Sequence, residues 1–359
     1  MWPYWLMFLV PATVAAILRF EPKGSAGNVG SVRERIEWLC LAVVLWLTIG
    51  FRHEVGGDWG NYLQMLSGVE LRSLREVFLL ADPGYQLVSW ISLRAGWQIY
   101  GVNLFCGGIF IFGLVQFCRT QPRPWLALAV AVPYLVIVVA MGYTRQSVAI
   151  GLAMLGLVAL MRGETRRFVL FVFLAGTFHK TVVLLLPIAG LASSKNRYWT
   201  TLWALLVFIA AYFLFLQESV ESMYALYIEE GMQSQGALIR LLMNAVPAAI
   251  LLFWGRRFHF SVYEAALWRW FAIISLAMFV ALWVTPSSTV LDRFALYFAP
   301  LQLIVFSRLP GFFSRAALNR RIIISSILLY YAAVQFVWLN LGDHAHAWIP
   351  YSFYPLELL

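Results

Sequence analysis

The feature that most restricts the fold of this chain is a series of long apolar runs that carry almost no charge. Of its 359 residues, 62% are hydrophobic and only 12% are charged, which is about half the charged share of an ordinary soluble domain. The runs are continuous and do not alternate with a period of two, so each is expected to satisfy its backbone as a helix in lipid. The sequence therefore predicts an all-α polytopic integral membrane protein.

Clusters of Lys and Arg separate the apolar runs and predict how the chain is threaded through the membrane. Basic residues concentrate at the cytoplasmic ends of spans. The clusters are Arg19/Lys23/Arg33/Arg35, Arg119/Arg123, Arg162/Arg166/Arg167, Lys195/Arg197, Arg256/Arg257 and Arg308/Arg315/Arg320/Arg321. Between them, about ten full spans alternate in direction if both termini lie outside. These expected spans are residues 3–20, 37–51, 102–118, 125–141, 145–161, 199–216, 237–254, 263–284, 292–308 and 321–340.

The apolar segment 168–191 is a special case, because basic clusters flank it on both sides. It is therefore expected to enter and leave on the cytoplasmic side. A single helix of that length would cross the membrane once and invert every later loop. Two half-helices that meet near His179, as a re-entrant pair, keep the topology consistent, and one long tilted helix is the alternative.

Two longer excursions, residues 52–100 and 217–236, are expected as outer loops of a single transmembrane domain that comprises residues 1–359. The first excursion must start and end outside. Its second half, about residues 84–100, has apolar residues at helical spacing, and we expect an amphipathic helix that lies on the outer surface.

Asp58 is a candidate site residue in the first excursion, within the sequence VGGDWGNY. The neighbouring Gly56, Gly57 and Gly60 permit a tight backbone path that presents its side chain. Two interpretations stay open at this point. Asp58 caps the helix that follows, or its carboxylate orients or deprotonates a sugar hydroxyl.

Basic residues at expected outer helix ends form the second group of candidates. Arg145 opens one span, where topology disfavours Arg, so an anionic partner is expected for it. Asp292 and Arg293 are adjacent, and neighbouring side chains point about 100° apart on a helix, so they are not expected to satisfy each other. Together with Lys180, the two arginines suit a pyrophosphate or another anion, because one guanidinium group can donate two parallel hydrogen bonds to the oxygens of a phosphate.

His179 lies at membrane depth beside Lys180, where ionisable groups need a partner, water or a chemical role. One interpretation is a structural histidine that is hydrogen-bonded to a neighbouring helix. The other is a general base, because the ordinary pKa of imidazole suits proton transfer near neutral pH. The sequence does not rank His179 against Asp58 for this role.

Several classes of site have no motif in the sequence. It contains no Walker A sequence, no strand-linked GxGxxG, no HExxH and no closely spaced Cys/His set, so no cofactor and no metal ion are expected. Cys40, Cys106 and Cys118 lie in apolar runs and are expected to pack between helices. His344 and His346 are expected in a solvated outer loop. The net charge of +9 is attributed to topology and not to nucleic acid.

A series of short motifs, in this order, resembles the EpsG family of exopolysaccharide and O-antigen polymerases, the Wzy type. The resemblance covers the chain from about residue 52 to its end. The motifs are VGGDWGNY, DPGY at 82–85, TRQSVA, FHKTVVLLLP, DRFALYF and the closing PYSFY. Two positions depart from the family pattern, namely Asp82, where Glu is frequent, and Lys180, where Ser is usual.

The resemblance implies a metal-independent glycosyltransferase that joins oligosaccharide repeat units carried on undecaprenyl pyrophosphate. The growing chain is the donor, a fresh lipid-linked unit is the acceptor, and a direct displacement would invert the anomeric centre. The expected location is the bacterial inner membrane with the active site facing the periplasm, an architecture like that of GT-C enzymes is compatible with it, and a chain-length regulator is an expected partner.

Combined with the resemblance, the candidate residues divide into two roles. The catalytic candidates are His179 and Asp58. The candidates for binding pyrophosphate or sugar are Arg145, Arg293, Lys180, Arg52, Gln146, Tyr297 and Tyr351.

Other functions remain as alternatives. A membrane glycosyltransferase that uses a polyprenyl phosphate sugar would show the same outer carboxylate and arginines, and it differs in its donor. An acyltransferase would need a path from the cytoplasm to its histidine. A flippase for lipid-linked oligosaccharide commonly has broken helices at matching positions in two halves, whereas only one broken segment is expected here.

Overall fold

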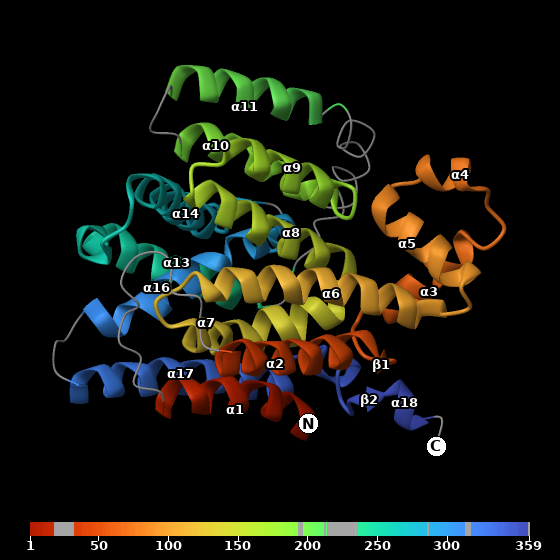
Figure 1. The fold of residues 1–359 in the computed structure, drawn as a ribbon, viewed down its shortest axis with the longest axis horizontal. Helices are drawn as coiled ribbons and strands as arrows, with labels where there is room; N and C mark the ends of the chain where they lie inside the picture. Colours follow the sequence, from red (N-terminus) through yellow and green to blue (C-terminus); the bar gives the residue numbers. More distant parts are fainter. Residues whose placement is uncertain are drawn as a thin grey trace.

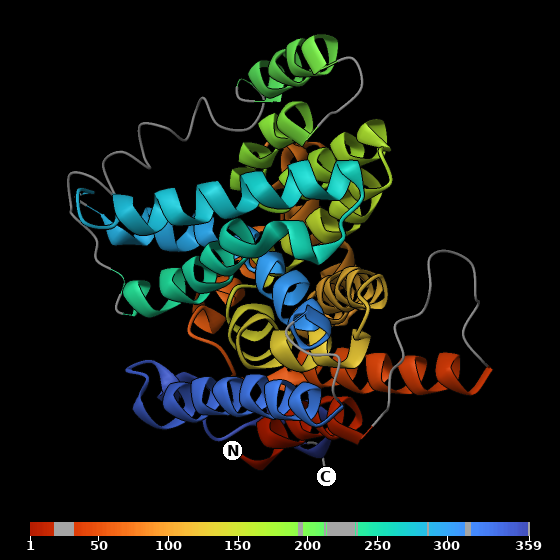
Figure 2. The ribbon, with the colours of Figure 1, turned by 90° about the vertical axis from the view of Figure 1, so that its left-hand side faces the viewer.

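The computed structural model describes residues 1–17, 32–192, 197–211, 213, 234, 236–285, 287–312 and 317–357. Nearly all of its regular structure is helical, as the composition predicts. The long helices are α1 (Trp2–Ile17), α2 (Val32–Gly50), α6 (Gln98–Arg119), α8 (Thr144–Met161), α11 (Arg197–Ala211), α13 (Ala237–Trp254), α14 (Val262–Ala281) and α17 (Ala317–Leu341). Figure 1 shows many of them lying side by side, and Figure 2 shows α13 and α14 lengthwise while α6 is nearly end-on, so the two groups cross.

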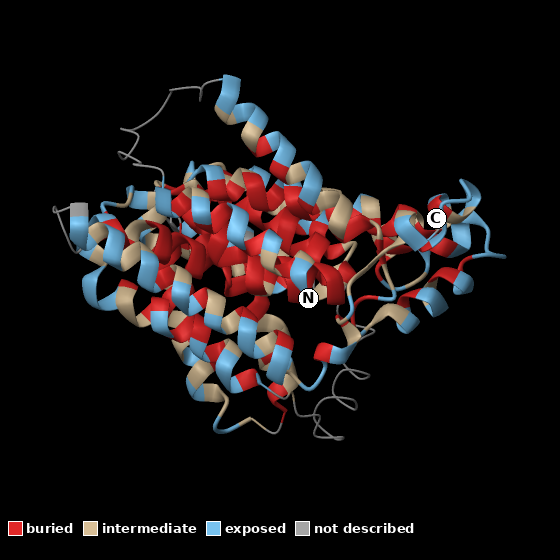
Figure 3. Ribbon diagram, turned by 90° about the horizontal axis from the view of Figure 1, so that it is seen from below, coloured by how far each residue is buried: buried red, intermediate tan, exposed pale blue. Residues whose placement is uncertain are grey.

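The centre of the molecule is the helix α7 (Pro124–Ala131), which continues as the π-helix η1 (Val132–Ala140). All of its residues except Pro124 and Tyr134 are buried, because α1, α16 and α17 pack around it. Figure 3 shows this buried centre surrounded by more exposed outer helices. A helix that is apolar on every side is stable only where neighbours or lipid cover it completely.

The helices confirm a helical membrane protein, while the number of spans stays a prediction. Within the described residues, five helices are long and apolar enough to cross a membrane, and six if one bent pair counts as a span. The five correspond to the expected spans 102–118, 145–161, 237–254, 263–284 and 321–340. Helices also form within the expected spans 3–20, 37–51, 125–141 and 199–216. Three of them, α1, α7 with η1, and α11, are shorter as described than the roughly 20 residues of a usual span. The last residues of the expected spans 3–20 and 199–216 lie outside the described residues.

The expected span 292–308 is bent. The chain forms α15 (Ser288–Ala295), η6 (Leu296–Phe298) and α16 (Pro300–Phe312), with a bend of 49°. Pro300 has no backbone N–H and cannot continue the helical hydrogen bonding, so the sequence did contain the signal for this break. Asn244 of α13 satisfies a carbonyl at the break, because its side chain donates to the Ala295 oxygen at 2.8 Å.

The segment 168–191 is broken where the sequence predicts, which excludes one long helix. It consists of α9 (Thr165–Gly176), η2 (Lys180–Leu185) and α10 (Leu186–Ala192). α9 packs along α8 and also contacts α10. The 3-10 helix η2 between α9 and α10 has six residues and is about 12 Å long. If the chain kept one direction, η2 would separate α10 from α9 by that length. The chain therefore turns back at 177–179.

The excursion 52–100 is a folded unit and not an open loop. It contains β1 (Arg52–His53), α3 (Trp59–Gly68), α4 (Leu74–Phe78) and α5 (Pro83–Arg94). The predicted surface helix at about 84–100 is therefore shorter than expected, since the chain turns at 95–97 and α6 begins. β1 pairs in antiparallel fashion with β2 (Ser352–Phe353), a strand pair that the all-α prediction missed.

The C-terminal strand β2 lies toward the end of the molecule that carries α3, α4 and α5, whereas the N-terminus lies near the middle of the lower edge (Figure 1). The first helix and the C-terminal segment of the chain are nevertheless in contact. Tyr4 and Trp348 hold them together, because the Tyr4 hydroxyl donates to the Trp348 carbonyl oxygen at 2.6 Å. We call the end of the molecule that carries α3, α4, α5 and β2 the cap end. The excursion 217–236 falls mostly outside the described residues.

Candidate active site

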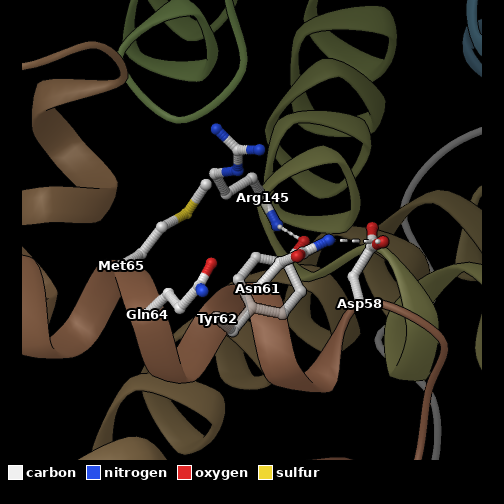
Figure 4. Close-up of a pocket in the computed structure, with 6 residues that line it drawn as sticks. All are labelled: Asp58, Asn61, Tyr62, Gln64, Met65 and Arg145. Atoms are coloured by element: carbon white, nitrogen blue, oxygen red, sulfur yellow. Dashed lines mark hydrogen bonds between the residues drawn. The ribbon is translucent and has the colours of Figure 1, made fainter.

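A cavity of about 320 Å³ opens at the cap end between α3 and the first turn of α8. Figure 4 shows its side chains along one side of α3, with Arg145 reaching over them from α8. The lining residues are Asp58, Asn61, Tyr62, Gln64, Met65 and Arg145. The Arg145 backbone N–H donates to the Tyr62 hydroxyl at 3.4 Å, which joins the two walls.

Asp58 is the N-cap residue of α3, yet its side chain makes no capping hydrogen bond. Among the described residues, its carboxylate accepts one long contact of 3.5 Å, from the Asn61 amide, and it lines the cavity. The preceding turn depends on Gly56, whose φ of 107° and close approach to the Met141 carbonyl oxygen exclude a side chain. Gly60 has no such restriction, because a Cβ there would meet no atom within 4 Å.

Arg145 has the anionic partner that its position demanded, and that partner is Asp82. Arg145 Nη1 donates to Asp82 Oδ2 at 2.6 Å, and the two side chains are 29% and 5% exposed. Arg145 Nε is buried without a hydrogen-bond partner among the described residues. The guanidinium group therefore keeps donor capacity for a second anion.

Asp82 is the residue that sequence reasoning missed, although its motif DPGY was noted. It caps α5 in the left-handed conformation with φ of 55°, which is costly outside glycine and is commonly found at functional sites. The Gly84 N–H donates to the Thr177 carbonyl oxygen at 2.8 Å, so the start of α5 docks on the 177–179 turn. Burial raises the pKa of Asp82, and the charges of Arg145 and Lys180 oppose that rise.

His179 lies at this turn in an extended conformation, between α9 and η2. Its Nδ1 atom lies 2.8 Å from the Thr181 hydroxyl and 3.0 Å from the Tyr297 hydroxyl. The three predicted cations belong to elements that meet at this turn. Lys180 follows His179, and Asp82, the partner of Arg145, caps the helix that docks on the turn. Arg293 lies four residues before Tyr297, whose hydroxyl contacts the imidazole.

Arg293 belongs to the same group through α15. Its guanidinium carbon lies 4.2 Å from the centre of the Tyr143 ring, and its carbonyl oxygen accepts from Gln146 Nε2 at 2.6 Å. As expected, Asp292 does not pair with Arg293. Asp292 instead accepts two hydrogen bonds from Arg240 of α13, at 2.6 and 2.7 Å, which ties α15 in place.

Two predicted binding residues lie outside this group. Arg52 is 1% exposed, and its guanidinium donates to the carbonyl oxygens of Ile49 and Val55 and to the side chains of Asn103 and Thr144. The Tyr351 hydroxyl donates to the Thr48 carbonyl oxygen at 2.7 Å. Both side chains hold the cap end together, so this geometry gives them a structural role.

The described residues contain no group of three or more His, Cys, Asp or Glu side chains that could hold a metal ion. His344 and His346 are exposed, as expected for a solvated loop.

The model of the EpsG family matches residues 35–353. The chain belongs to the EpsG family. The match includes the cavity, the 177–179 turn and α15, so the whole candidate site lies inside the region that the family shares. Membership points to an exopolysaccharide-related polymerase with several membrane helices. No curated protein and no solved structure matches the chain.

Proposed function

We propose that this EpsG protein joins oligosaccharide repeat units carried on undecaprenyl pyrophosphate, at the periplasmic face of a bacterial inner membrane. The growing chain is transferred from its lipid to the non-reducing end of a new lipid-linked unit. Undecaprenyl pyrophosphate is released in each round.

The observation that carries this proposal is that contacts between helices bring the elements that carry Arg145, Arg293 and Lys180 to the turn that holds His179. Three cations at one end of a helical membrane protein suit a lipid pyrophosphate, because the lipid tail stays in the bilayer and the charged group reaches its surface. Charge that develops on the leaving pyrophosphate is stabilised by donors that are already in position. Asp82 competes for Arg145, so donor binding requires this carboxylate to share or release the guanidinium.

Proton transfer is assigned to His179 and acceptor binding to Asp58. With Nδ1 protonated and donating to the Thr181 or Tyr297 hydroxyl, Nε2 carries the lone pair that accepts a proton. Arriving pyrophosphate adds negative charge near the imidazole, which stabilises its protonated form, so substrate binding makes the imidazole a stronger base. Asp58 faces the cavity and accepts hydrogen bonds from sugar hydroxyls.

The proposed step balances without a cofactor. The acceptor hydroxyl oxygen forms a bond to the anomeric carbon of the donor while the bond from that carbon to the pyrophosphate oxygen breaks. The bonding electrons leave with the pyrophosphate, and the hydroxyl proton goes to His179. One displacement inverts the anomeric centre, which NMR of the new linkage would reveal.

The test is complementation of a strain that lacks its own polymerase, with surface polysaccharide separated on a gel. We expect wild type to restore a ladder of chain lengths, and Arg145→Ala and His179→Ala to leave single repeat units at matched protein levels. Arg94→Ala is the control, because Arg94 is exposed and stacks on Trp90. A normal ladder with His179→Ala would show that this histidine is structural.

Purified protein separates the alternatives. Transfer from a sugar polyprenyl monophosphate, with no transfer from a pyrophosphate-linked unit, would assign the single-sugar glycosyltransferase. Movement of fluorescent lipid-linked oligosaccharide across liposomes without polymer formation would assign a flippase. A chain-length regulator remains a proposed partner, detectable as a change in ladder length on co-expression.

A further inference from the structure

Four aromatic rings from separate parts of the chain gather at the cap end, beside the cavity. They belong to His53, Trp59, Tyr100 and Tyr354. The centre of the His53 ring lies 6.0 Å from those of Trp59 and Tyr354 and 6.1 Å from that of Tyr100. Tyr100 and Tyr354 are stacked with centres 3.7 Å apart, and the His53 Nδ1 atom lies 2.6 Å from the Tyr100 hydroxyl. We call these four residues the aromatic cluster.

The β1–β2 pairing builds the cluster from both ends of the sequence. His53 pairs with Ser352, and the Tyr354 N–H donates to the Phe51 carbonyl oxygen at 2.9 Å. These bonds place the start of α18 (Tyr354–Glu357) beside the first residues of α3 and α6. The pairing of β1 with β2 therefore places the Tyr354 ring on the Tyr100 ring.

The cluster differs from the aromatic residues of the core. Core rings such as Trp268, Trp348 and Tyr4 are at most 1% exposed, whereas all four cluster residues are partly exposed. Within the part of the chain that the structure describes, the Trp59 indole N–H and the Tyr354 hydroxyl have no hydrogen-bond partner. The cluster thus presents apolar ring surface together with unused donors.

Two carboxylates lie close to the cluster. Glu54 follows His53 and is exposed, and Glu357 is exposed on α18; both act electrostatically on the Tyr100 hydroxyl. Interfacial Trp and Tyr often contact lipid headgroups, but carboxylates at this position repel an anionic membrane surface. They are suitable acceptors for neutral hydroxyl groups.

We propose that the aromatic cluster binds sugar rings of the glycan next to the reaction site. A pyranose presents an apolar C–H face and an edge of hydroxyls, which matches ring surface bordered by donors and carboxylates. The position supports this occupant, because Trp59 directly follows Asp58, which lines the cavity. The inference rests on the proposed polymerase function and adds a glycan-binding surface to it.

A surface of this kind has a defined effect on the product. Sugars bound at the cluster keep the growing polysaccharide near the cavity between transfers. If an aromatic contact is lost, the polysaccharide is released from the protein more often. The cluster therefore sets the length of the polymer and not the rate of a single transfer. This separates it from Arg145 and His179, whose loss prevents the transfer itself.

The test compares Trp59→Ala and Tyr354→Ala with wild type in the complementation assay. Loss of one aromatic contact is expected to lower the modal chain length roughly two- to tenfold while transfer continues. Trp97→Ala is the control, because Trp97 is 66% exposed near the same end and lies outside the cluster. Trp59→Phe retains the ring surface and should give a ladder closer to wild type.

A binding measurement makes the test independent of catalysis. The probe is the polymer freed from its lipid by mild acid, titrated into purified protein by calorimetry, and Trp59→Ala should bind it more weakly. An unchanged ladder, or equal binding of the polymer by wild type and Trp59→Ala, would overturn the proposal. So would weaker association of Trp59→Ala with anionic vesicles at unchanged polymer binding, which would assign the cluster to lipid. Failure of wild type to form any ladder would instead count against the polymerase function.

Discussion

The ion pair between Arg240 and Asp292 provides a quantitative test of how the site is held together. Their side chains are 15% and 11% exposed, and two hydrogen bonds of 2.6 and 2.7 Å join them. Removing one partner of a buried pair leaves an uncompensated charge and costs about 3–5 kcal/mol. Because this pair is slightly exposed, we expect about 3 kcal/mol for Asp292→Leu, or a melting temperature lower by roughly 6–12 °C.

The double variant Arg240→Met/Asp292→Leu separates stability from positioning. Replacing both charges by apolar groups of similar volume often leaves stability unchanged. The free energy of unfolding of the double variant should therefore lie within about 1 kcal/mol of the wild-type value. It should nevertheless lose polymer ladder, because α15 loses its charged contact with α13 next to Arg293 and the guanidinium of Arg293 is no longer held in position. Melting is measured on purified protein in detergent and the ladder by complementation.

Two results would refute this reasoning. If Asp292→Leu melts within 2 °C of wild type, by a scale of about 2–4 °C per kcal/mol, the pair is not a buried contact. If the double variant is stable and fully active, the pair does not position Arg293. Val290→Ala is a suitable control on the same helix, because the Val290 side chain is exposed.

Two further predictions concern the cap end. Asp82→Asn keeps a residue type that tolerates the left-handed backbone and removes the carboxylate that competes for Arg145, so binding of polyprenyl pyrophosphate, measured by calorimetry, should tighten up to about tenfold; weaker binding would contradict the competition. Gly56→Ala should lower the melting temperature strongly because its backbone and surroundings exclude a Cβ, whereas Gly60→Ala, inside α3, should be neutral or stabilising.

The order of the short motifs predicted which residues form the candidate site, which composition alone could not do. DPGY, TRQSVA, FHKTV and DRFALYF are distant in sequence, and contacts in the folded chain bring the segments that contain Asp82, Arg145, His179 and Arg293 into one group. Arg52 shows the limit of that approach. Its position next to an outer helix end resembles that of Arg145, but its guanidinium turns inward to four protein acceptors, and no local pattern distinguishes the two.

By itself the sequence determined that this is a helical membrane protein and where most helices lie, and it favoured a break in the segment 168–191 near His179. These properties follow from local hydropathy and from the placement of charges, which report the solvent that each segment meets. Only the tertiary structure decided that Asp82 pairs with Arg145, that Asp292 pairs with Arg240, and that the chain ends meet in the β1–β2 pair. The physical reason is that a charge or a strand edge can be satisfied by many partners in the sequence, and the packing of the helices determines which of them lies within hydrogen-bonding distance.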